Sequence, residues 1–320
     1  MREGRGMRHR AQRGLLLLLA MSATGFVHVR MDTATRADHV ELRIPDPGRA
    51  RLTALGFEPV VADYYWVQGL HLVGGTGGDV SAHGDTIGDL IELVTALDPW
   101  VDHPYRFAAV WLTDTLEQVR RANALLVRAI AYHPTDWRNR FHLGYNRFFY
   151  LQDNRAAADV LAPAIAMEGA PRYLGAFVAR LRADGGDLDT AAVFLETLIE
   201  EAPDEYVRAG YLKAYDEIET ERRARLLDAA RAAFWKQNRR DIRAPEELWS
   251  GPGRVLRSVP PPHPHFPGFA WALDPERNEI VSTFYGTRYR LHIHGADVDL
   301  RARWRDQMDA ERRRRGAGET

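Results

Sequence analysis

The 320-residue chain contains no cysteine and almost no lysine. The absence of cysteine excludes disulfides, thiolate metal sites, a cysteine nucleophile and the lipid-modified cysteine of a bacterial lipoprotein. Only two of the 43 basic residues, Lys213 and Lys236, are lysines, and with 44 acidic residues the net charge is −1. A chain with this balance lacks the basic excess of a nucleic-acid-binding protein, so we expect no nucleic-acid partner.

The sequence also lacks the motifs of several large enzyme classes. It contains no G-x-S-x-G, no H-E-x-x-H and no G-x-x-x-x-G-K-[ST], which would indicate a serine nucleophile, a zinc protease and a phosphate-binding loop. A glycine-rich run at residues 74–78 lacks the Lys and Ser/Thr of a phosphate loop, so we interpret it as a flexible turn. We therefore predict a protein that is not an enzyme and holds no cofactor and no metal ion.

Long apolar runs are absent except at residues 14–29, where only Ser22, Thr24 and His28 interrupt the run. Five arginines precede it: Arg2, Arg5, Arg8, Arg10 and Arg13. A basic flank before an apolar run keeps the amino terminus in the cytoplasm and directs the following residues across the membrane. Residues 1–35 are therefore predicted to form a signal-anchor or signal segment.

Two interpretations of this segment stay open. A helix of sixteen residues spans roughly 24 Å, which is short of the ~30 Å hydrocarbon core. As an uncleaved anchor, it would make the protein a single-pass protein of the bacterial inner membrane, with its bulk on the periplasmic side. As a signal cleaved near Ala23, it would release the protein into the periplasm. A cytosolic product would require a mis-started chain.

Residues 36–237 show the spacing of a helical repeat. Apolar residues recur at helical intervals in blocks that end at Pro99, Pro134, Pro171 and Pro203,. These prolines lie 35, 37 and 32 residues apart, close to the 34-residue period of helix-turn-helix repeats. Stacked helix pairs of this kind bury a continuous core and leave a concave face.

The repeat resembles the tetratricopeptide-repeat (TPR) family, whose signature combines a Leu-Gly pair, a turn Gly, a small residue in the second helix and a closing Pro. Here the corresponding residues are Leu143, Gly144, Gly186 and Ala156, together with the four prolines. The resemblance implies a mainly α fold, an αα-hairpin solenoid with a superhelical groove that binds a protein or peptide partner.

The chain departs from the family pattern at Arg147, where Tyr is preferred, and at Ala179, where Gly is expected. The block at residues 62–66, Ala-Asp-Tyr-Tyr-Trp, is also similar to the start of a group of exported bacterial TPR proteins of undefined function.

The helical pattern predicts a core and a capping helix. Residues 204–237 read as one long helix that caps the repeats, with exposed four-apart pairs Glu219–Arg223 and Glu221–Arg225,. Ala122, Ala156 and Ala191 are expected at close helix crossings. The predicted core residues are Trp66, Phe107, Leu125, Phe148, Leu161 and Phe194.

Residues 238–320 differ in composition from the helical repeat, since eight of the seventeen prolines lie between Pro245 and Pro275. Residues 269–273 and 280–284 are predicted strands of a hairpin. Residues 287–294 alternate, with Tyr289, Leu291 and Ile293 on one face, and predict a third strand,. The rest, from residue 299, is predicted to be a polar helix with a frayed, Arg-rich tail. The region is therefore a small β-containing appendage.

Two histidine pairs, His263 with His265 and His292 with His294, have a spacing that some zinc sites use,. Arg288 and Arg290 share the face of the second pair and disfavour a cation there, and the first pair has no acidic residue close in sequence. A solvated basic face or an anion-contacting patch is the alternative to a metal site.

Positions that line the groove in TPR proteins map onto Trp111, Tyr145 and Arg180 at one repeat position, and onto Arg138 and Tyr173 at another. Aromatic residues and arginine are favoured at protein-binding hot spots, although inter-helix packing is an alternative role for each residue. We predict a non-catalytic scaffold that holds a protein or peptide in this groove. The alternatives are an extracytoplasmic protein that binds a small molecule or cell-wall ligand, favoured by an enclosed polar cavity, and a metal-dependent enzyme.

Overall fold

The computed structural model describes residue 22 and residues 43–75 and 83–318. The chain divides into two compact units, Met1–Ile44 and Pro45–Thr320, and the elements from α2 onward belong to the second. Among the described residues, no helix is both long and apolar enough to cross a membrane. The predicted membrane segment at residues 14–29 lies, apart from residue 22, outside the described residues.

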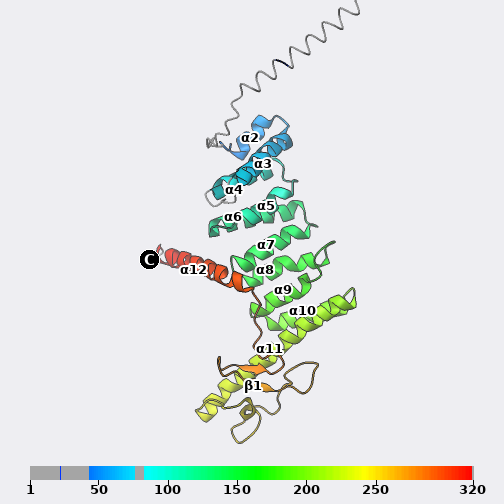
Figure 1. Ribbon diagram of the computed structural model, residues 1–320, viewed down its shortest axis with the longest axis vertical. Coiled ribbons are helices and arrows are strands. Elements are labelled where there is room, and N and C mark those ends of the chain that lie inside the picture. Colours follow the sequence, from blue (N-terminus) through cyan, green and yellow to red (C-terminus); the bar gives the residue numbers. More distant parts are fainter. Residues whose placement is uncertain (1–21, 23–42, 76–82, 319–320) are drawn as a thin grey trace, which may run out of the picture. The chain divides into compact units, whose positions relative to one another are not determined.

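Helices that follow one another in the sequence pack against one another (Figure 1). Their bounds are α2 Pro47–Ala54, α3 Glu58–Gly75, α4 Gly84–Leu97, α5 His103–Trp111, α6 Leu116–Tyr132, α7 Trp137–Phe149, α8 Asn154–Leu161 with the 3-10 helix η2 Ala162–Ala166, α9 Leu174–Asp184, α10 Leu188–Glu200 and α11 Glu205–Asn238. The predicted mainly helical fold is confirmed, and consecutive packing is compatible with a repeat solenoid.

Local sequence explains where these helices begin and end. Six of them start behind an Asp or Thr whose side chain accepts a hydrogen bond from a backbone N–H of the first turn: Asp46, Thr115, Asp136, Asp153, Asp187 and Asp204. The four periodic prolines lie between helices, as predicted. The predicted long helix is confirmed as α11, with Asp204 as its N-cap.

The core runs through the stack as a series of apolar clusters. Of the predicted core residues, Leu125, Phe148 and Leu161 are buried, whereas Trp66, Phe107 and Phe194 are half-buried at cluster edges. Trp66 packs edge-on against Phe107, with ring centroids 5.0 Å apart.

Small residues mark the helix crossings, with one correction. Ala122 and Ala191 are fully buried, as expected at a close crossing. Ala156 is only half-buried, and its neighbours Ala157 and Ala158 are the fully buried residues of α8. The assignment of Ala156 was therefore wrong by one to two positions, because helical spacing alone does not fix the rotation of a short helix about its axis.

The predicted hairpin is present as a two-stranded antiparallel sheet, β1 Trp271–Leu273 and β2 Ile280–Ser282, with Trp271 opposite Ser282. With the 3-10 helix η3 Pro245–Leu248, it forms a cluster on the carboxy-terminal half of α11. This cluster joins the predicted appendage to the helical stack within one compact unit.

Two predictions for the end of the chain were wrong. Residues 288–294 are extended but form no strand, because their apolar side chains pack on helices and their backbone does not pair with the hairpin. The predicted frayed tail at Arg312–Arg315 is helical, since α12 spans Gly295–Gly318.

Candidate functional site

Residues 288–294, which we call the strap, lie in an extended conformation across helices α9 and α11. The Tyr289 hydroxyl donates a hydrogen bond to the carbonyl oxygen of Arg180 (3.0 Å). The Leu291 N–H donates to Asp184 Oδ1 (3.4 Å). Tyr289 packs on the α9–α11 cluster, and Leu291 and Ile293 pack on the α7–α9 cluster. The predicted alternation is therefore real, and its apolar face packs, partly buried, against helices.

The strap is anchored at its start by Arg288. This guanidinium donates to both oxygens of Glu221 (2.8 Å each) and to Asp228 (2.7 Å). Burial alone would lower the pKa of Arg288, but the hydrogen bonds to Glu221 and Asp228 outweigh it and raise the pKa. The predicted Glu221–Arg225 pair also exists (3.1 Å). Glu221 is however only 5% exposed, so the prediction of an exposed pair was wrong for this residue.

Helix α12 follows the strap and contacts α6, and in Figure 1 it runs across the direction of the stack. Trp304 is buried in a cluster with Leu116 and Val119 of α6, and its ring lies 5.1 Å from that of Tyr150. Arg301 lies over the ring of Phe148 at 4.4 Å, and burial lowers the pKa of this arginine. These contacts dock the end of the chain on helices that lie more than 100 residues earlier in the sequence.

A second contact to α6 is electrostatic. Arg120 donates to Glu311 at 2.9 Å, and this hydrogen bond is the main reason why the pKa of Glu311 falls to about 2. Both side chains are partly exposed, so the pair orients α12 more than it stabilises it.

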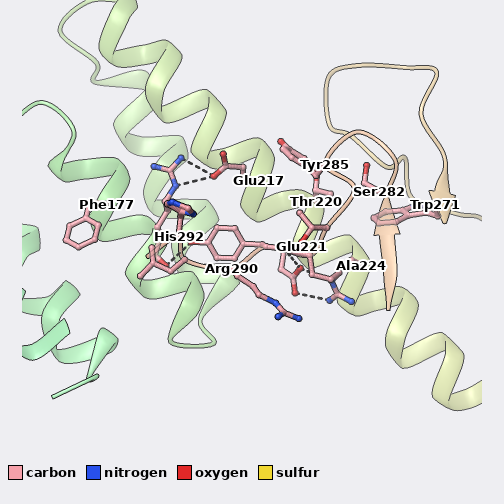
Figure 2. Close-up of a pocket in the computed structure, with 15 residues that line it drawn as sticks. Phe177, Glu217, Thr220, Glu221, Ala224, Trp271, Ser282, Tyr285, Arg290 and His292 are labelled. Carbon is pink, nitrogen blue, oxygen red and sulfur yellow. Dashed lines mark hydrogen bonds and ion pairs between the residues drawn. The ribbon is translucent and has the colours of Figure 1, made fainter. Parts of the chain in front are cut away.

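The strap, α9, α11 and the hairpin line a half-open cavity of about 420 Å³. In Figure 2, Phe177 of α9 and Trp271 of β1 lie at opposite ends of the lining, with Glu217, Thr220 and Glu221 of α11 between them. Aromatic side chains contribute much of the wall, and burial raises the pKa of the Tyr285 hydroxyl.

Charges that line the cavity are paired with one another. Arg180 donates to Glu217 at 3.0 and 3.1 Å, and Arg290 pairs with Glu279 at 3.0 Å. Thr220 is a buried polar residue of the wall. Its side chain is almost fully buried, and its hydroxyl has no hydrogen-bond partner among the described residues.

The first predicted histidine pair meets an acidic residue that is distant in sequence. His265 Nδ1 lies 2.7 Å from Asp216 Oδ1, and His263 Nε2 lies 3.8 Å from the other oxygen of the same carboxylate. His263 Nδ1 accepts hydrogen bonds from the N–H groups of His265 and Phe266 (3.1 Å each). The neutral His263 ring therefore carries its proton on Nε2, facing Asp216.

Burial lowers the pKa of His263, with further lowering by His265 and Arg223 and an opposing effect of Asp216. The part of the chain that the structure describes contains no group of three or more His, Cys, Asp or Glu placed to hold a metal ion. His292 and His294 are exposed.

The predicted groove residues of the first set lie on three successive hairpins. Trp111 ends α5, half-buried beside Phe107 at 5.8 Å between ring centroids. Tyr145 of α7 is 37% exposed and stacks on Phe149 at 5.3 Å. Arg180 of α9 is partly exposed and bound to Glu217. None of the three is fully buried, and among the described residues none contacts another.

The second predicted set lies at the amino-terminal ends of helices. Arg138 is the second residue of α7 and covers the Trp137 ring at 5.1 Å. Tyr173 is the N-cap residue of α9 and is 58% exposed. These residues lie two helical turns before Tyr145 and Arg180, on nearly the same side of their helices,.

Sequence reasoning missed the acidic side chains of α11 that receive the strap and the histidines. Asp216, Glu217 and Glu221 follow one another on one helix, and this acidic run was the available signal. None of the protein-family models, characterised proteins or solved structures compared with this chain matches it.

Proposed function

We propose that the helical stack is a TPR-like solenoid that acts as a non-catalytic scaffold and holds an extended segment of a protein partner. The apolar run at residues 14–29 would tether it to the bacterial inner membrane with its bulk in the periplasm, or export it there after cleavage. The observation that carries the proposal is the strap, because it is a peptide segment bound to the surface of helices α9 and α11.

The strap uses the chemistry expected of a bound peptide. Alternate side chains enter the apolar clusters of the helices, and its backbone and Tyr289 bond to α9. Recognition of extended peptides commonly combines such main-chain bonds with pockets for alternate side chains. Arg288, the first residue of the strap, donates hydrogen bonds to Glu221 and Asp228. This pairing fixes the register of the strap on the helices.

The proposal therefore specifies a partner by chemistry. It would carry an arginine followed by large apolar residues at alternate positions, in an extended stretch. Tyr145 and Trp111 lie on hairpins that precede the strap-binding helices, and their partly exposed rings would extend the surface for a longer partner,.

A synthetic peptide with the sequence of residues 286–296 tests this proposal. In the full chain with Arg288→Ala and Tyr289→Ala, the native strap is weakened, so the labelled peptide should bind saturably, as measured by fluorescence anisotropy. The unchanged chain should bind it at least ten-fold more weakly, because its own strap competes at high effective concentration.

A peptide with serine in place of the three apolar residues is the control and should not bind to either chain. If the loosened chain does not bind the native sequence either, the surface does not recognise peptides in this way and the scaffold proposal loses its support.

The cavity favours a second candidate function, the binding of a small molecule. Its volume lies within the range of ligand pockets, and the partnerless Thr220 hydroxyl offers one hydrogen bond inside an aromatic wall. Since the charged groups of the wall are paired, the ligand would be uncharged and carry a hydroxyl or amide group.

Native mass spectrometry of the purified chain tests this second candidate. A bound compound should appear as a discrete added mass that is lost from an Ala224→Phe variant, since Ala224 lines the cavity and is almost fully buried. An unliganded mass in both samples would count against it.

A further inference from the structure

Helix α3, the second helix of the stack, has two apolar faces. Ala62, Trp66, Gly69 and Val73 lie on one side of the helix, because their spacing of three or four residues returns to the same side. Ala62 and Gly69 are buried, Val73 packs on the α4–α6 cluster, and Trp66 packs on Phe107. This face joins α3 to the rest of the stack.

The opposite face carries Val60, Tyr64 and Val67, again at three- and four-residue spacing. Their exposed fractions are 64%, 58% and 44%. Phe57, Leu55 and Leu52, in the turn before α3 and at the end of α2, are 67%, 82% and 79% exposed. We call these six residues the terminal apolar face.

A terminal helix of a repeat protein normally has a polar outer side, because no further repeat covers it. Helix α3 breaks this rule over its first three turns, where Val60, Tyr64 and Val67 occupy the outer side, and the exposed His71 follows them on that side,. Large exposed apolar patches of this kind mark an interaction surface. Asp63 lies at the rim of the face and not at its centre, so it does not interrupt the patch.

We propose that the terminal apolar face docks on the surface of a lipid bilayer. The sequence places the apolar run of residues 14–29 only 22 residues before Leu52. A connection of that length reaches at most roughly 75 Å, so a membrane-inserted run keeps the face close to the bilayer.

The charge next to the terminal apolar face also favours a lipid bilayer as its partner. Arg49 is exposed on α2, three residues before Leu52 and therefore on the same side of that helix, and it forms no ion pair with another described residue,. An apolar surface with aromatic residues and a flanking arginine matches the composition of segments that lie in the interface of anionic membranes. The docking is independent of the peptide surface on α9 and α11.

The absence of cysteine makes a direct test possible, since one introduced cysteine is labelled uniquely. The full chain, with Tyr64→Cys or Val193→Cys, is labelled with a polarity-sensitive fluorophore and reconstituted in phosphatidylcholine vesicles containing phosphatidylglycerol. Val193 of α10 is the matched control, because it is 62% exposed but lies outside the terminal apolar face. Emission is then quenched either by nitroxide-labelled lipid or by aqueous iodide.

The label at position 64 should be quenched several-fold more by the lipid nitroxide than the label at position 193, and less by iodide. Arg49→Gln should reduce the lipid quenching at position 64.

Equal iodide quenching at both positions would overturn the docking, even if the chain stays on the vesicles through its anchor. Protection of position 64 from both quenchers would also overturn it, since the cover would then be protein. A chain that fails to associate with the vesicles at all would reject the proposal together with the anchor.

Discussion

At Gly144 and Gly175, the absence of a side chain allows two helices to pack closely. A Cβ atom at Gly144 would lie 2.4 Å from Leu161 Cγ, and one at Gly175 would lie 2.7 Å from the Tyr211 hydroxyl oxygen. Gly144 belongs to the Leu-Gly pair on which the sequence resemblance rests, and its close approach to α8 gives that pair a physical reason in this chain.

Gly144→Ala should destabilise the fold by about 1–3 kcal/mol, because Leu161 is fully buried and has little room to move,. Urea denaturation measures the change. Gly210→Ala is the matched control within α11, where a Cβ meets no atom within 4 Å. It should be neutral or stabilise the protein by about 0.5–1 kcal/mol. Equal effects of the two substitutions would contradict the crossing.

The register of the last hairpin has its own test. Ala191 of α10 is fully buried in the α9–α11 cluster, so Ala191→Leu should overpack it and cost on the order of 1–3 kcal/mol. An unchanged melting temperature would show that this crossing tolerates a large residue.

His263 predicts a loss of stability in acid. Its pKa is lowered in the folded protein, chiefly by burial, so below the ordinary histidine pKa of about 6.5 the unfolded chain binds more protons. The stability that depends on neutral His263 is present above that pH and is lost as the pH falls towards the folded pKa. The burial of His142, which also lowers its pKa, acts in the same direction.

His263→Asn should keep an acceptor for the N–H groups of residues 265 and 266 and remove the titration. The free energy of unfolding should then fall less between about pH 7 and pH 5 than it does in the unchanged protein. His71→Asn, at an exposed position, is the control and should leave the slope unchanged. An unaltered slope in the His263 variant would argue against this role.

At the scale of elements, the strap and α12 decide how the end of the chain relates to the stack. The strap has the two-residue alternation of a strand, yet its partners are the clusters of α7, α9 and α11. The hairpin strands β1 and β2 pair with each other. Helical grooves accept an extended segment when its alternate side chains fit the gaps between successive helices.

Arg288→Ala should release the strap. It removes the main partner of the buried Glu221 carboxylate. Breaking a buried ion pair lowers the free energy of unfolding by about 3–5 kcal/mol. We expect a value near the lower end here, because Arg225 stays bound to Glu221. Hydrogen exchange of residues 289–294 should accelerate. Arg290→Ala removes a partly exposed pair with Glu279 and should cost less than about 1 kcal/mol. Similar exchange in the two variants would refute the anchoring role of Arg288.

At the scale of the whole molecule, the location of the protein and the stability of its helical unit depend on separate parts of the chain. The clusters of the described residues all lie within Pro45–Thr320, so the helical unit holds its own core. The segment of residues 14–29 is predicted to decide where this unit resides.

A fusion to a reporter that fluoresces only in the cytoplasm tests the location. Placed after Thr320, it should be dark, because the basic flank retains the amino terminus and exports the rest. The same fusion with the five leading arginines changed to glutamate should lose the orientation and become brighter. A bright fusion of the unchanged chain would contradict export, and the periplasmic scaffold with it.

The helices, the turns at the four prolines, the long α11 and the hairpin were determined by the sequence itself. Each depends on residues a few positions apart, such as Asp204 and the N–H of Val207, and local spacing encodes such contacts directly. The groove residues stay a prediction, and of these Arg180 also lines the observed cavity.

Tertiary structure alone decided which distant groups meet. Arg288 reaches Glu221 across 67 residues, and His265 reaches Asp216 across 49. The alternation of residues 287–294 is the same whether they pair with a strand or pack on helices, so it fixed their extended form but not their partner. That choice followed from the surfaces of α9 and α11, where burial of Tyr289, Leu291 and Ile293 and the pairing of Arg288 are satisfied together.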